Sequence, residues 1–243
     1  MIETRDLRRS FGGVTALDGV TLRIDAGERR AIIGPNGAGK TTLFNILTGE
    51  LEPTSGRVLL AGADVTRRPP YELARRGLAR MYQRNELFET LAALDNVLLA
   101  LVAAHGPYRP LFSPSTGARA EAVELLARVG LGERATTPAR SLSHGERRQL
   151  ELALALAQRP RVLLLDEPTA GMSPVETARI TELIASLERS LTIVIVEHDM
   201  DVVFRLADRI SVLHEGRVLA EGTPAAVRGD RVVNEVYLGK VVA

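Results

Sequence analysis

The chain has 243 residues, of which 45% are hydrophobic and 25% are charged, and its formal net charge is +1. This apolar content is sufficient for a buried core in one large or two small domains, which excludes a disordered chain, and the near balance of charge argues against a nucleic-acid-binding surface. The absence of cysteine excludes disulfides and cysteine-based zinc sites.

The first part of the chain, residues 1–28, is predicted to form strands and turns. Apolar side chains occupy roughly alternate positions between Val14 and Ile24, as in a strand that packs on one face. A further strand and turn are expected at residues 56–62. Residues 69–76 predict a short helix, because proline suits the first helical turn.

Residues 34–41, Gly-Pro-Asn-Gly-Ala-Gly-Lys-Thr, fit the phosphate-binding pattern G-x-x-x-x-G-K-[ST]. The apolar run 31–33 predicts a buried strand before this loop, and residues 42–47 predict a helix after it, which is the context that the pattern requires. Glycines allow close approach to an anion, and amides at the helix start point at phosphate oxygens. Lys40 is expected to neutralise the β- and γ-phosphates, and the Thr41 hydroxyl to bind Mg²⁺. The predicted nucleotide contacts here are Gly34, Pro35, Asn36, Gly37, Ala38, Gly39, Lys40, Thr41 and Thr42.

The middle of the chain has helical periodicity. Residues 91–104 and 118–129 predict two helices, and the Pro, Gly and Ser content of residues 105–117 marks a loop between them. The first helix is the longest nearly apolar stretch, yet it is shorter than the about 20 residues that cross a bilayer. We therefore expect no membrane-spanning helix, and the polar residues 1–6 do not predict a signal peptide.

Two continuous apolar runs, residues 162–165 and 191–196, predict parallel strands covered by helices on both faces. Ligands bind beyond the carboxyl ends of such strands, and Asp166-Glu167 and Glu197-His198 follow the two runs there. These pairs and the phosphate loop are expected to converge on one crevice. The prediction is a single domain over residues 1–243, with an α/β core at 1–88 and 160–243 and an inserted helical subdomain at about 89–159.

Asp166 and Glu167 are predicted to perform different tasks. Neighbouring residues of a strand point to opposite sides, so one carboxylate can serve Mg²⁺ while the next faces an attacking water. Phosphoryl transfer needs both a cation for the developing charge and a group that positions the nucleophile. An acidic turn after a strand is common by itself, and the phosphate loop is what favours the functional interpretation.

A second motif, Leu-Ser-His-Gly-Glu-Arg-Arg-Gln, occupies residues 142–149. Ser143 and Glu146 fit a capping box at the start of a helix that ends before Pro160, and its Ala and Leu content predicts burial. Capping boxes occur in many ordinary helices. The distinctive feature is the order of the phosphate loop, this segment and an apolar strand that ends in Asp-Glu.

With these motifs in this order, almost the entire sequence resembles the ATP-binding-cassette (ABC) ATPases. Residues 142–146 are similar to the LSGGQ signature of that family, with His144 in place of the first glycine. Gln83 matches the glutamine that contacts Mg²⁺ and water and couples to a membrane partner. His198 matches the switch histidine that contacts the γ-phosphate. Phe11 falls where an aromatic residue stacks on adenine.

The resemblance implies a P-loop NTPase fold in which a mostly parallel α/β core carries an N-terminal antiparallel β subdomain and the helical subdomain. It implies ATP and Mg²⁺ as cofactors, ATP hydrolysis, and a head-to-tail dimer with each ATP held between one phosphate loop and the other subunit's signature helix. The expected catalytic residues are Glu167, His198 and Gln83. The expected metal ligands are Thr41, Gln83 and Asp166. Further nucleotide contacts are expected from Phe11, Ser143, Gly145 and Glu146.

Besides His144, two further features depart from the family pattern. Phe11 stands where tyrosine is usual, so stacking is retained and a hydroxyl is lost. The segment after the catalytic glutamate, commonly Ser-Ala-Leu-Asp, reads Ala-Gly-Met-Ser at residues 170–173, which puts the role of Ser173 in doubt.

Residues 236–239 and 169–174 resemble the ATPase subunits of branched-chain amino-acid importers. Urea-type importers and the lipopolysaccharide-export ATPase have similar endings and remain alternatives. ABC ATPases of DNA repair and translation carry coiled coils, zinc modules or a second cassette, which this sequence does not contain. The favoured interpretation is a cytoplasmic ATPase on the inner face of the cell membrane. Its expected partners are a second ATPase subunit, permease subunits and a solute-binding protein, without nucleic acid, and the solute is selected by those partners.

Overall fold

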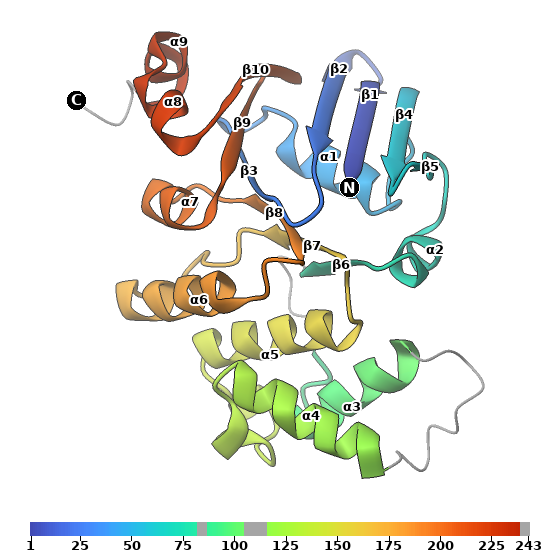
Figure 1. Ribbon diagram of the computed structural model, residues 1–243, viewed down its shortest axis with the longest axis vertical. Helices are drawn as coiled ribbons and strands as arrows, with labels where there is room; N and C mark the ends of the chain where they lie inside the picture. Colours follow the sequence, from blue (N-terminus) through green and yellow to red (C-terminus); the bar gives the residue numbers. More distant parts are fainter. Residues whose placement is uncertain (82–86, 105–115, 239–243) are drawn as a thin grey trace.

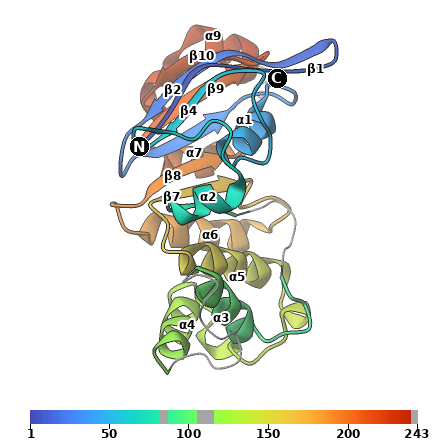
Figure 2. The same ribbon diagram turned by 90° about the vertical axis from the view of Figure 1, so that its right-hand side faces the viewer.

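The computed structural model describes residues 1–81, 87–104 and 116–238. Two β-sheets occupy one end of the molecule, and helices α3 (Ala93–Ala104), α4 (Thr116–Arg128) and α5 (His144–Ala157) occupy the other (Figures 1 and 2). The predicted α/β class is confirmed by this arrangement.

The smaller sheet is antiparallel and lies near the N-terminus, as the resemblance implied. Its strands are β1 (Ile2–Phe11), β2 (Val14–Ile24), β4 (Ser55–Leu60) and β5 (Ala63–Asp64), in the order β2-β1-β4-β5. Alternation along β2 places Leu22 and Ile24 in the core, because successive side chains of a strand point to opposite faces.

The larger sheet is mostly parallel, with the order β10-β9-β3-β8-β7-β6. Only β10 pairs antiparallel with its neighbour within this sheet as described. The strands are β3 (Arg29–Ile33), β6 (Leu78–Met81), β7 (Val162–Asp166), β8 (Thr192–Val196), β9 (Arg209–His214) and β10 (Arg217–Gly222). Every residue of β3, β7 and β8 is buried, which explains their continuous apolar runs.

Helices cover both faces of this sheet. Helix α1 (Lys40–Leu47) lies between the two sheets, and α6 (Pro174–Ser186) lies on the opposite face with α5 (Figure 1). The remaining helices are α2 (Pro70–Arg75), α7 (Met200–Leu206), α8 (Pro224–Gly229) and α9 (Arg231–Val233), with single turns at Gly132–Arg134, Ala139–Ser141 and Asn234–Leu238.

Strand β7 divides the core between these faces. Val162 and Leu164 pack with α1 and the antiparallel sheet, whereas Leu163 and Leu165 pack with the helices of the other end. Helix α5 contacts α3, α4, α6 and β6. The helical segment therefore shares its apolar core with one face of the parallel sheet.

The helix predicted at residues 91–104 begins at Ala93 instead. Ala92 pairs with Pro138, and the carbonyl of Leu91 accepts a hydrogen bond from the Ala139 amide at 2.9 Å, so tertiary pairing holds these two residues outside the helix. The predicted loop at residues 105–117 lies outside the described residues up to position 115. Within the described ranges, the helices are all too short or too polar to span a membrane.

Candidate functional site

The phosphate-loop residues connect β3 to α1, as predicted. Gly34, with a φ of +152°, lies so close to the neighbouring strand β9 that a Cβ would be 2.1 Å from the carbonyl oxygen of Leu213. At Gly39, with a φ of +99°, a Cβ would lie 2.5 Å from the carbonyl oxygen of Ala16. Both positions therefore require glycine for steric as well as conformational reasons.

Lys40 opens α1 and is 7% exposed. Its Nζ donates to the carbonyl oxygens of Gly34 at 2.6 Å and Pro35 at 3.0 Å, so the ammonium group lies over the loop. Burial lowers the pKa of Lys40, and the charges of Glu167 and Asp166 oppose that shift. Gly39 provides no side-chain cap, and the first amides of α1 are available to an anion together with the Lys40 charge.

The carboxyl ends of β7 and β8 bring Asp166, Glu167 and His198 to the same edge of the sheet as the loop. The prediction that strand alternation separates the two carboxylates is wrong, because β7 ends at Asp166 and Glu167 has a left-handed φ of +48°. That conformation costs a non-glycine residue about 1–2 kcal/mol. The Glu167 amide donates to the Val196 carbonyl at 2.9 Å, which anchors the turn.

Glu167 and His198 form a direct pair. Nε2 of His198 lies 2.7 Å from Oε1 of Glu167, so an Nε2–H tautomer donates to the carboxylate. The His198 side chain is 42% exposed and that of Glu167 is 22% exposed, which leaves both accessible to a ligand.

Two buried residues that are not among the predicted site residues stabilise this edge of the sheet. Glu197, 3% exposed, accepts hydrogen bonds from the Thr169 amide at 3.1 Å, from the Thr169 hydroxyl, and from the His198 amide at 2.8 Å. Arg80 donates from Nη2 to Oδ2 of Asp166 at 2.6 Å. A single sequence provides no signal for the Arg80–Asp166 and Thr169–Glu197 contacts, because each joins residues that are far apart along the chain.

The predicted capping box at the start of α5 is confirmed. Ser143 Oγ accepts from the Glu146 amide at 3.2 Å, and Glu146 Oε2 accepts from the Ser143 amide at 2.8 Å. This amide hydrogen bond is the main cause of a lowered pKa for Glu146, and Arg134 also donates to its carboxylate at 3.0 Å. Glu146 is therefore a helix-capping residue, and its nucleotide contact stays a prediction.

Ser173 has a role of the same kind at the start of α6. Its side chain caps the helix in a second capping box, and its hydroxyl donates to Oε2 of Glu176 at 2.7 Å. This bond is the main cause of a lowered pKa for Glu176, with a contribution from the amide of Gly145. His144 Nε2 lies 3.2 Å from the Ala170 carbonyl oxygen. The signature segment is thus linked to residues 170–173 within one chain.

Phe11 lies at the end of β1 and is 46% exposed. The guanidinium of Arg9 lies 4.5 Å from the centre of its ring, a cation–π contact. Gln83 lies outside the described residues. Within those residues, no three His, Asp or Glu side chains form a group that could hold a metal ion.

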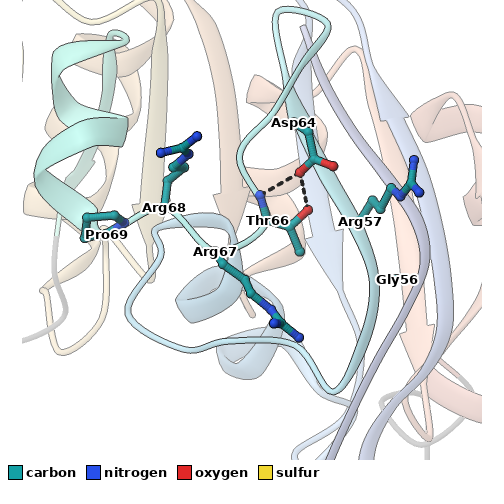
Figure 3. A pocket seen from close by; sticks show the side chains of 7 residues that line it. All are labelled: Gly56, Arg57, Asp64, Thr66, Arg67, Arg68 and Pro69. Atoms are coloured by element: carbon teal, nitrogen blue, oxygen red, sulfur yellow. Dashed lines mark hydrogen bonds between the residues drawn. The ribbon is translucent and has the colours of Figure 1, made fainter.

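A separate pocket lies at the edge of the antiparallel sheet beside α2 (Figure 3). Its carboxylate, Asp64, accepts hydrogen bonds from Thr66, which lower the pKa of Asp64. The side chains of Arg57, Arg67 and Arg68 point in three different directions in Figure 3, so they do not form a converging anion site.

Known proteins are similar to this chain in sequence and in fold. A family model described as "ABC transporter" matches residues 17–170. The high-affinity branched-chain amino acid transport ATP-binding protein BraF of Pseudomonas aeruginosa is 39% identical over 99% of this chain and 98% of its own length. The chain belongs to the ABC transporter family. It is an ATP-binding and ATP-hydrolysing subunit of that family.

Other ABC relatives are similar over equally long stretches. The high-affinity branched-chain amino acid transport ATP-binding protein LivG of Escherichia coli is 38% identical over 99% of this chain and 98% of its own. The lipopolysaccharide export system ATP-binding protein LptB of Acidithiobacillus ferridurans is 36% identical over 98% of this chain and 97% of its own. A second family model, "Branched-chain amino acid ATP-binding cassette transporter", matches residues 217–243.

Solved ABC cassettes have the same fold. The ADP conformation of the cassette MJ1267 has a TM-score of 0.88 and 30% identity, covering 98% of both chains. The dimeric structure of the bacterial cassette MJ0796 has a TM-score of 0.80 and 31% identity, covering 92% of this chain and 99% of that one. The nucleotide-binding fold and the ABC class predicted from the motifs are confirmed by these comparisons.

Proposed function

We propose that this ABC ATPase powers the transport of branched-chain amino acids. The observation that carries the proposal is the match of residues 217–243 to the branched-chain amino-acid cassette model, outside the region that the general ABC model covers. The similarity to BraF and LivG along nearly the whole chain supports the same solute class.

The phosphate loop is proposed to bind ATP through its amides, Lys40 and the start of α1. Phe11 is proposed to stack on the adenine. Mg²⁺ commonly uses one or two protein ligands and completes its shell with phosphate and water, so a dedicated protein cage is not needed. The exposed Thr41 hydroxyl and the Asp166 carboxylate fit this demand, with Gln83 as a further proposed ligand. Bound there, the ion would neutralise charge on the transferred phosphoryl group.

Glu167 is proposed to accept a proton from the attacking water, and His198 to contact the γ-phosphate. Their 2.7 Å contact supports a shared task, because the imidazole of His198 lies beside the carboxylate that would act on the water. Both lie at the edge of the sheet where the phosphate loop leads into α1. The charge of Lys40, the first residue of α1, interacts with Glu167. The proximity of Lys40, Glu167 and His198 supports the proposal that all three act on one phosphate chain.

Two subunits are proposed to pair head to tail, with Ser143, Gly145 and Glu146 of one chain completing the ATP site of the other. The dimeric structure of the MJ0796 cassette supports the pairing of two chains. Permease subunits and a solute-binding protein are the proposed further partners. They would place the ATPase at the inner face of the cell membrane, as a peripheral subunit.

The test is reconstitution of the chain with the permease subunits that co-purify with it, in liposomes that contain ATP. We expect uptake of radiolabelled leucine, isoleucine or valine with a matching solute-binding protein, and none with a Glu167→Gln complex. ATP-dependent release of lipopolysaccharide, or uptake of urea, without amino-acid uptake would contradict the proposed solute and favour the alternatives.

A further inference from the structure

Arg80 is a buried cation on the edge strand β6, at the boundary between the nucleotide site and the rest of the parallel sheet. Its side chain is 7% exposed, and that of its partner Asp166 is 6% exposed. Burial of a charged pair is costly unless both members are well bonded, so such a pair needs a structural or functional explanation.

The position of Arg80 follows from strand register. Arg80 pairs with Leu164 in the parallel β6–β7 ladder, and Leu164 faces α1. Asp166 lies two residues further along β7, so Asp166 and Arg80 share that face. Gln83 follows Arg80 by three residues in the sequence.

The guanidinium of Arg80 connects Asp166 to the end of α1. Nη2 donates to Oδ2 of Asp166 at 2.6 Å. Nη1 donates to Oδ1 of Asn45 at 2.8 Å and to Oε2 of Glu50 at 2.9 Å, at the end of α1, and the group lies 5.8 Å from the centre of the Phe44 ring. Helix α1 begins at Lys40, so the same helix presents the phosphate loop at one end and is held by Arg80 at the other.

We propose that Arg80 is a positioning residue that orients the Asp166 carboxylate for the Mg²⁺ that accompanies the nucleotide. Holding Oδ2 fixes the direction of Oδ1, and a carboxylate has enough lone pairs to accept the guanidinium and serve a cation together. Arginine suits this task because its planar fork presents separate N–H groups to Asp166 and to the end of α1, whereas lysine has only one compact ammonium group. The inference rests on the proposed nucleotide and Mg²⁺ site.

The test measures ADP affinity of the full chain by isothermal titration calorimetry, in excess Mg²⁺ and in EDTA. The ratio of the two affinities is the Mg²⁺ enhancement. We expect Arg80→Met to lower this enhancement about fivefold or more, because a charge-assisted hydrogen bond is lost. Arg80→Lys, which retains the charge, is expected to lower it as well. Affinity in EDTA should stay within about twofold, because Asn45, Glu50 and Asp166 lie outside the phosphate loop.

Two controls separate positioning from general stability. Arg148→Met breaks another buried pair, in which Arg148 bonds Glu151 at 2.9 Å within α5, and should leave the Mg²⁺ enhancement unchanged. Asp166→Asn removes the carboxylate, and adding Arg80→Met to it should cause no further loss of enhancement. If Arg80→Met does not fold, Arg80→Lys carries the comparison.

An unchanged Mg²⁺ enhancement in Arg80→Lys and Arg80→Met would overturn the proposal. An equal loss of affinity in EDTA would also overturn it, since that result means a structural role at α1. Failure of the unmodified chain to bind ADP would instead remove the proposed nucleotide site itself.

Discussion

Glu167 leaves the parallel sheet in a left-handed turn, and this turn directs its carboxylate to His198. An ordinary extended residue after Asp166 would have continued the alternation of β7. Positive φ values at non-glycine residues are uncommon and persist where surrounding contacts hold them. Here the Val196 carbonyl and the His198 imidazole hold the residue on both its backbone and its side chain.

Glu167→Gln is expected to reduce ATP turnover by roughly 10²–10⁴-fold, because an amide of the same shape cannot accept the proton of the attacking water. Nucleotide affinity should be retained, since the lost charge does not belong to the phosphate loop. Phosphate release measures turnover, and equilibrium binding of ATP measures affinity.

Glu182→Gln is the matched control for that change. Glu182 lies on α6 with a side chain that is 71% exposed and pairs only at the surface with Arg205, so turnover should stay close to that of the unmodified chain. Near-normal hydrolysis by Glu167→Gln would show that another group positions the water.

The residues of the phosphate loop could be assigned from sequence because one local pattern contains them all. Lys40 stands out within that pattern, because the chain has only two lysines, Lys40 and Lys240. Arginine occupies the other Lys/Arg positions. A compact ammonium group suits a phosphate cradle, whereas the fork of Arg80 suits a buried carboxylate. The hydrogen-bond partners of Arg80 and Glu197 could not be predicted, because they are set by strand register and tertiary packing.

At the scale of elements, the loop between β3 and α1 should tolerate a side chain better at one of its glycines than at another. Gly37 and Gly39 both have positive φ, +83° and +99°, but a Cβ on Gly37 has no atom within 4 Å. On Gly39 it would meet Ala16 and Leu17 of β2, at 2.5 Å and 2.7 Å. The loop is therefore packed against the antiparallel sheet at Gly39 and is open at Gly37.

Gly39→Ala is expected to destabilise the chain considerably more than Gly37→Ala. Both changes carry the left-handed penalty of about 1–2 kcal/mol. Gly39→Ala also forces β2 and α1 apart. For a chain of this size the shared penalty lowers Tm by roughly 2–8 °C, and we expect at least twice that fall for Gly39→Ala in thermal unfolding followed by circular dichroism. Equal falls would contradict the packing argument.

Two helix starts carry a local sequence signal. Ser143 and Glu146 form the predicted capping box, and Ser173 with Glu176 form a second one with the same S-x-x-E spacing. The sequence therefore contained the signal that resolves the structural role of Ser173: serine caps α6, as aspartate also can. The start of α3 was misplaced because the Ala92–Pro138 pairing is a long-range contact.

At the scale of the whole molecule, the signature segment and the phosphate loop belong to different layers. Helix α5 packs on α3, α4, α6 and β6, whereas α1 packs on β2 and β7. The layered architecture was predictable from the apolar runs and the order of motifs. Because these two segments lie on separate layers, pairing of two chains would bring the proposed contacts of both segments to one ATP.

Ser143→Asp tests that pairing in a Glu167→Gln background, in which ATP is retained. Aspartate caps a helix as well as serine does, so α5 should remain intact. Its charge would face the phosphates bound by the other chain, and like charges in a partly buried contact oppose association. We expect ATP and Mg²⁺ to convert Glu167→Gln into a particle of two chains, and Ser143→Asp to remain a single chain, by light scattering after size exclusion.

Ser143→Asn is the uncharged control, because asparagine caps a helix equally well. This variant should still form the ATP-dependent dimer. Lys40→Ala in the same background should fail to dimerise for a different reason, loss of the charge-assisted contact with ATP. Equal circular dichroism for Ser143→Asp and Ser143→Asn would exclude unfolding as the cause. An ATP-dependent dimer of undiminished amount with Ser143→Asp would mean that the signature segment does not face the partner's nucleotide.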